Sequence, residues 1–150
     1  MSNTQAICNS FKVEILRGIH ALGTSVVRAG TGADTIKGAL YYAAGSYGAG
    51  TTAYSVTNEV SSDGYTAGGA TVTNANAPTL DTNTAIWTPS ANLSWTGVTI
   101  ADFDALLLYN STQSNKAIAV FNFGSTSIVA GNFTLTMPTN AAATALLQLA

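Results

Sequence analysis

The chain has 150 residues and a formal net charge of −2, and only 8% of its residues are charged, against about 25% in an ordinary soluble domain. Its five Lys and Arg residues are scattered, which excludes the basic patch of nucleic-acid-binding proteins. No apolar run reaches the roughly 20 residues that cross a membrane as a helix. This length suits one domain, and a polar but uncharged surface is typical of a subunit packed in an assembly, because free monomers rely on charge for solubility.

Residues 1–34 are expected to form an N-terminal segment that carries the one clear helix, over Ser10–Leu22. Four apolar residues recur at helical spacing and make a single stripe: Phe11, Ile15, Ile19 and Leu22. Asn9 or Ser10 can cap the start, and Gly23 is a natural stop. This pattern favours a helix that covers one end of a sandwich, and a helix that docks onto a partner subunit is the alternative.

Residues 35–150 are expected to form a β domain. Apolar and polar residues alternate with the two-residue period of strands, and Gly and Pro residues separate the runs. The expected strands, about eight in all, include Thr35–Tyr42, Ala70–Thr73, Thr79–Thr88, Leu93–Ile100, Asn132–Met137 and a last strand that ends at Ala150. Short strands at regular spacing predict a mainly β fold, an antiparallel β-sandwich or a jelly-roll-like domain with one short N-terminal helix.

The centre of the predicted domain is the stretch Asp102–Gly124. Two apolar runs, Leu106–Tyr109 and Ala117–Phe123, flank a short polar link, Asn110–Asn115. Each run is too short for a typical helix, so the stretch predicts a hairpin. Both faces of the second run are apolar, and such a strand needs cover on both sides. We therefore expect it in the middle of a packed sheet or under a neighbouring subunit.

Residue types that carry out chemistry are scarce in this chain. It has one histidine, His20, and one cysteine, Cys8, so the sequence predicts no catalytic set, no metal site and no cofactor. We interpret His20 as a helix-end residue and Cys8 as a small buried apolar residue. Asp102 and Asp104 would share a face of a strand, and a solvated or capping role is favoured for them over acid–base chemistry or calcium binding.

Several stretches together resemble a group of small virion proteins of tailed bacteriophages. The order is a short helix in CNSFKVEILRGIHAL, a strand in DTIKGALYY, the segment TTAYSVTNEVSSDGYTAGG, the hairpin LLLYNSTQSNKAIAVFNFG and the tail FTLTMPTNAAATALLQLA. The likeness covers nearly the whole chain. It implies a structural component of the particle, of the capsid decoration or cement type. The chain departs from the pattern at Asn122, where an Asp is usual.

The resemblance leads us to expect a non-enzymatic protein on the capsid exterior, assembled in the host cytoplasm. It would bridge shell subunits, with the major capsid protein or other virion proteins as partners, and would itself form a homo-oligomer, expected to be a trimer. The alternative is a host-recognition module on a tail or head fibre that binds surface glycans. The candidate interface residues lie on the predicted helix and in or near the glycine-rich loops: Phe11, Ile15, Ile19, Tyr47, Tyr54 and Tyr65.

Overall fold

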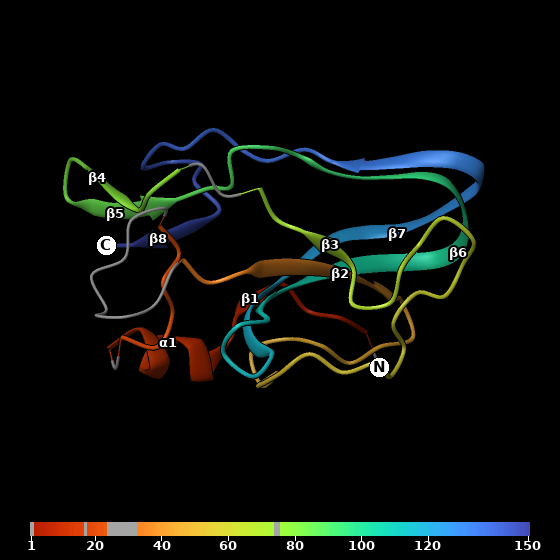
Figure 1. Ribbon diagram of the computed structural model, residues 1–150, viewed down its shortest axis with the longest axis horizontal. Helices are drawn as coiled ribbons and strands as arrows, with labels where there is room; N and C mark the ends of the chain where they lie inside the picture. Colours follow the sequence, from red (N-terminus) through yellow and green to blue (C-terminus); the bar gives the residue numbers. More distant parts are fainter. Residues whose placement is uncertain (1, 17, 24–32, 74–75) are drawn as a thin grey trace.

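The computed structural model describes residues 2–16, 18–23, 33–73 and 76–150, without the side chains of Val13 and Leu16 (Figure 1). The chain is mainly β, with two antiparallel sheets and one short helix in this part, so the predicted fold class is confirmed. The elements are β1 Ala6–Ile7, α1 Asn9–Leu16, β2 Ile36–Tyr42, β3 Ala70–Thr71, β4 Thr79–Asp81, β5 Thr84–Trp87, β6 Leu93–Asn110, β7 Lys116–Leu135 and β8 Leu147–Leu149. One sheet has the order β1-β7-β6-β2-β3, and the other has the order β4-β5-β8.

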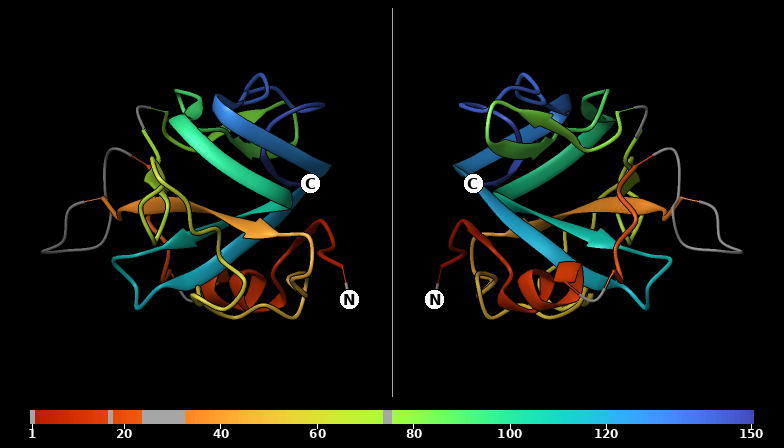
Figure 2. Two further views of the ribbon diagram at one scale, coloured as in Figure 1. Left: turned by 90° about the vertical axis from the view of Figure 1, so that its right-hand side faces the viewer. Right: turned by 90° about the vertical axis from the view of Figure 1, so that its left-hand side faces the viewer.

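The predicted central hairpin is the main element of the fold, and it is longer than expected. β6 has 18 residues and β7 has 20, so the separately predicted strands Leu93–Ile100 and Leu106–Tyr109 are one strand. The pairing of β6 with β7 is interrupted by register shifts between Trp95 and Ala105. Such irregularities bend a ribbon and increase its twist. The outer half of the hairpin consists of residues 93–103 of β6 and 126–135 of β7, and the inner half consists of residues 105–110 and 116–122 next to the turn. The outer half folds back over the inner half (Figures 1 and 2). This fold-back creates the sandwich-like arrangement.

The inner half of the hairpin is covered on both faces, as its apolar pattern predicts. Leu106, Leu108 and Phe121 belong to one face, because Leu106 pairs with Phe121. Between this face and the outer layer lies a small apolar space lined also by Leu135 and Met137. The opposite face of the sheet carries Tyr109 of β6 and Tyr41 of β2. The ring of Tyr54 stacks on Tyr109, and the ring of Tyr47 packs at a tilt against Tyr41. Six large apolar side chains of the hairpin are buried to different extents, four fully and two by about half: Leu106, Leu108, Ile118 and Val120, then Phe121 and Phe133.

The helix is shorter than the apolar stripe predicts. α1 ends at Leu16, and Gly18 adopts a φ of +67°. The Gly18 N–H donates to the carbonyl of Ile15 at 2.9 Å, and the Ile19 N–H donates to the carbonyl of Glu14 at 3.0 Å. A glycine in the left-handed region with bonds back to the last turn ends a helix. Ile19 and Leu22 therefore lie beyond α1, and the predicted extent to Leu22 is wrong.

The region predicted as one strand, Thr79–Thr88, is a hairpin. β4 and β5 are joined by a two-residue turn, Thr82–Asn83, and β8 pairs with the other edge of β5. The C-terminal strand is confirmed, although it ends at Leu149. Cys8 is fully buried, as predicted, and it belongs with Phe11 to the same core as the strands. The N-terminal segment thus packs directly on the β domain.

Candidate functional site

α1 and the three-stranded sheet lie at the same end of the molecule (Figure 1). Residues of both line an apolar cleft of about 190 Å³. Its lining is mostly apolar and includes Ile7, Phe11, Ile15, Leu22, Trp87 and Leu147, with His20 and Gln148 as polar residues. Phe11 and Ile15 reach it together because they are one helical turn apart. We call this the end cleft. An open apolar hollow of this kind is a candidate contact site for a partner.

An exposed apolar row continues from the end cleft across the three-stranded sheet. The strand register pairs Leu80 with Ala85 and Ala85 with Leu149, so the three side chains stand on one face. Leu80 is 68% exposed and Leu149 is 50% exposed. We call these three residues the apolar row. The row could not be predicted from the sequence, because the interpretation of Thr79–Thr88 as one strand hides the pairing that brings these residues together.

His20, which lines the end cleft, belongs to a network of polar side chains that are mostly buried. Glu14 accepts hydrogen bonds from Lys116 Nζ at 2.6 Å and from His20 Nε2 at 2.8 Å. On the other side of the ring, His20 Nδ1 lies 3.1 Å from Nδ2 of Asn110, which also donates to Asp34 at 2.7 Å. We call these five residues the His20 network. It joins α1 and the segment after it to the turn between β6 and β7.

The network shifts the acidity of its members. Burial lowers the pKa of His20 below its usual value, although its bond to Glu14 opposes that change. Burial alone would raise the pKa of Glu14, but its hydrogen bonds to Lys116 and His20 lower it. At neutral pH the structure therefore holds a charged Glu14–Lys116 pair beside a neutral imidazole. His20 could be interpreted from the sequence only as a helix-end residue, because three members of the His20 network, Asp34, Asn110 and Lys116, lie 14 or more positions away from it in the chain.

Glu59 is the centre of a second buried polar group. Its carboxylate accepts hydrogen bonds from the hydroxyls of Tyr54 at 2.6 Å and Tyr65 at 2.8 Å, and from the Gly68 N–H at 2.7 Å. Burial raises the pKa of both phenols, and the charge of Glu59 raises it further. The Tyr65 hydroxyl also accepts the Leu40 N–H of β2 at 3.0 Å. This group therefore fastens the segment between β2 and β3 to the sheet.

Asp102 and Asp104 do not form a joint site. Asp104 is buried and accepts hydrogen bonds from Asn3 at 2.5 Å and Asn122 at 2.9 Å. Asp102 is exposed, has a φ of +50° and accepts a bond from Ser125 at 2.6 Å. Asn122 is the departure from the phage pattern, and the amide suits this place because a carboxylate could not donate to Asp104.

The six candidate interface residues do not form one surface. Phe11 and Ile15 meet in the end cleft, where Phe11 is only 1% exposed. Ile19 is half-buried and follows α1. The three tyrosines are half-buried and cover the sheet, each with a ring against another aromatic residue: Tyr47, Tyr54 and Tyr65. Their role in binding a partner stays a prediction.

Within the described ranges, no group of three or more His, Cys, Asp and Glu residues could hold a metal ion. Burial, and then the nearby Glu14, raise the pKa of the Cys8 thiol to about 11. The thiol is therefore protonated near neutral pH, and the reactive thiolate is disfavoured. No helix in the same residues is long and apolar enough to cross a membrane.

Comparisons of the chain with protein-family models, with curated proteins and with solved structures find no match.

Proposed function

We propose that this chain is a non-enzymatic structural protein of a bacteriophage particle, a decoration or cement protein that bridges capsid subunits. One observation supports an assembly role most directly: the fold buries more than half of its acidic residues and leaves Leu80 and Leu149 of the apolar row exposed at one end. Four of the seven acidic residues are buried: Glu14, Asp34, Glu59 and Asp104. The resemblance of nearly the whole chain to small virion proteins supports the phage assignment.

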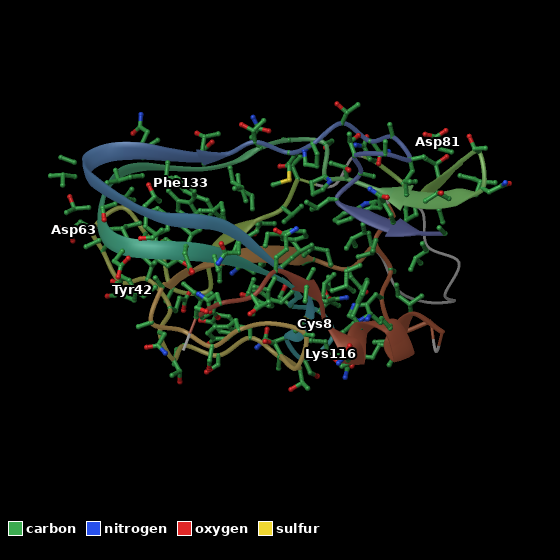
Figure 3. The ribbon with its side chains drawn as sticks, turned by 180° about the vertical axis from the view of Figure 1, so that it is seen from behind. Cys8, Tyr42, Asp63, Asp81, Lys116 and Phe133 are labelled. Carbon is green, nitrogen blue, oxygen red and sulfur yellow. The ribbon has the colours of Figure 1, made fainter. Side chains whose placement is uncertain are left out.

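The end cleft and the apolar row are the contact surface that fits this function best. Asp81 is the nearest acidic residue in that sheet (Figure 3), and its carboxylate is engaged by the Ala142 N–H at 2.6 Å. Burial of apolar surface is far less sensitive to salt than exposed ion pairs are. A contact of this kind would hold at any ionic strength. The five-stranded sheet, which is covered on both faces, gives the contact a rigid support. The partner is the major capsid protein or another virion protein, and a homo-oligomer, expected to be a trimer, presents the surface.

The test counts copies of the protein in purified particles and locates them in a particle reconstruction. We expect hundreds of copies on the shell, and particles that lack the protein should lose their genome at a lower temperature. Leu80→Asp should lower the number of bound copies because a charge on the apolar row opposes burial. Val56→Asp is the matched control, since Val56 is 70% exposed but lies outside the row. Full occupancy with Leu80→Asp would contradict the proposed surface.

A host-recognition module that binds glycans is the second candidate. It is favoured by a shallow polar hollow of about 350 Å³ in the loop after β2, whose lining includes hydroxyl and amide side chains and Tyr47. Sugars are bound by such polar groups beside an aromatic ring. A few copies confined to a fibre tip, in place of hundreds on the shell, would support this alternative and remove the decoration role.

A further inference from the structure

The only histidine of the chain is buried with partners at both ring nitrogens. The side chain of His20 has 0% exposure. Nε2 lies 2.8 Å from the Glu14 carboxylate and Nδ1 lies 3.1 Å from Asn110 Nδ2. The ring also packs edge-on against Phe11 in the end cleft, with the ring centroids 4.8 Å apart. Any change in the charge of His20 therefore acts on the contact between the N-terminal segment and the sheet.

Asn110 determines where the proton of His20 lies. Its Oδ1 accepts the backbone N–H of Gln113 at 3.1 Å, and its Nδ2 donates to Asp34 at 2.7 Å. A backbone N–H only donates and a carboxylate only accepts, so this amide cannot be turned over without loss. Its NH₂ group consequently faces Nδ1 of His20. That nitrogen must be the acceptor, and Nε2 carries the proton that is donated to Glu14.

A second proton on His20 conflicts with this arrangement. Nδ1–H would point at the NH₂ group of Asn110, and two donors would face each other. Turning the Asn110 amide over would place its NH₂ group against the Gln113 N–H and its oxygen against the Asp34 carboxylate. Each arrangement loses hydrogen bonds between buried groups, which is costly. The neutral imidazole keeps every one of these bonds.

The charged groups around His20 come from three parts of the described chain. Glu14 of α1 and Asp34, before β2, attract an imidazolium, and Lys116 of β7 repels it. Cys8 is close to Glu14 but carries a protonated thiol. The net result is a pKa of His20 below its usual value, because burial is the largest influence. The surroundings thus favour the same neutral state that the hydrogen bonds require.

We propose that the His20 network is a proton-sensitive latch, which holds α1 against the β6–β7 hairpin when His20 is neutral and releases it when His20 is protonated. A proton from solvent enters Nδ1, the bond to Asn110 is lost, and the ring leaves its place. Glu14 and Phe11 then lose the contacts that His20 makes with them. Acidification opens the end cleft and exposes its apolar walls. This inference does not depend on the proposed function.

The first test follows His20 directly. Because the chain has one histidine, its imidazole signals in an NMR titration are unambiguous. We expect a midpoint below the usual value of about 6.5. Over the same pH range, hydrogen exchange of residues 9–22, corrected for intrinsic rates, should accelerate. Because the release of α1 is linked to the binding of one proton, its equilibrium constant rises by at most about tenfold for each pH unit of acidification.

The second test removes the titration. In His20→Gln, exchange over residues 9–22 should no longer respond to pH between 7.5 and 5, whatever its baseline. Lys12→Gln is the matched control, because Lys12 is exposed on the same helix, and it should retain the response. A titration midpoint at or above 6.5, an unchanged exchange rate in the native protein, or a response that persists in His20→Gln would each overturn the latch. If His20→Gln does not fold, the titration and exchange of the native protein decide the question.

Discussion

At the scale of single residues, Gly69 shows how closely the segments after β2 approach the sheet. A Cβ atom built on Gly69 would lie 1.9 Å from the carbonyl oxygen of Gly38, and Gly69 has a φ of +69°. Gly97 has nearly the same φ, +67°, but a Cβ there meets nothing within 4 Å. The two positions therefore separate the cost of a left-handed backbone from the cost of a steric clash.

We predict that Gly97→Ala lowers the free energy of unfolding by about 1–2 kcal/mol, the cost of a left-handed conformation for a residue with a Cβ. Gly69→Ala should cost a further 1–3 kcal/mol or so, because backbone cannot yield as a flexible side chain does. Urea unfolding of both variants measures the difference. Equal losses would show that the backbones at Gly69 and Gly38 can separate freely.

At the scale of elements, the β4–β5 hairpin contains a strained turn. Of its two turn residues, Thr82 has a positive φ, +57°, and Asn83 does not. A two-residue turn with a positive φ only at its first position favours glycine there. A β-branched residue in that conformation is a steric outlier. The strain lies next to the exposed Leu80 of the apolar row.

We predict that Thr82→Gly raises the free energy of unfolding by about 0.5–1 kcal/mol, after the greater freedom of glycine in the unfolded chain is subtracted. Asn83→Gly is the matched control and should give no gain, since its backbone needs no positive φ. Thermal melts of the two variants give the comparison. A lower melting temperature for Thr82→Gly would mean that the threonine side chain contributes more than its backbone costs.

At the scale of the whole molecule, tyrosines connect the five-stranded sheet to the segment between β2 and β3, which covers one of its faces. Burial raises the pKa of four of the six tyrosines: Tyr41, Tyr54, Tyr65 and Tyr109. For Tyr109 the pKa is raised to about 12. The unfolded chain ionises its tyrosines near their ordinary pKa of about 10, before these four ionise in the folded state. Their contribution to stability is therefore complete below pH 10 and is lost as the pH rises above it.

We predict a cooperative alkaline unfolding transition in which these four phenols ionise together with the loss of structure. Absorbance at 295 nm follows ionisation, and far-UV circular dichroism follows the fold. The Cys8 thiol, whose pKa is raised to about 11, adds to this loss of stability, and its contribution begins to be lost at a slightly lower pH than that of the tyrosines. If all the tyrosines ionise while the far-UV circular dichroism spectrum remains that of a β protein, these residues do not hold the segment between β2 and β3 against the sheet.

Local pattern was enough to predict the mainly β class, the central hairpin and the start of α1, because strand and helix periods are properties of short windows. The burial of Cys8 was predicted from its residue type, because a lone cysteine behaves as a small apolar residue. The end of α1 could not be predicted from its stripe, since Gly18 in the left-handed region overrides the apolar spacing beyond it.

Only the tertiary structure decided the fold-back of β6 and β7, the apolar row and the His20 network. Each depends on strand register or on contacts between residues far apart in the chain. Glu14 and Lys116 are 102 positions apart, and Asn3 and Asp104 are 101 apart. No local window contains both partners of such a pair. The amide that faces His20 likewise belongs to Asn110, 90 positions away, so the tautomer of His20 could not be predicted from its neighbours in the chain.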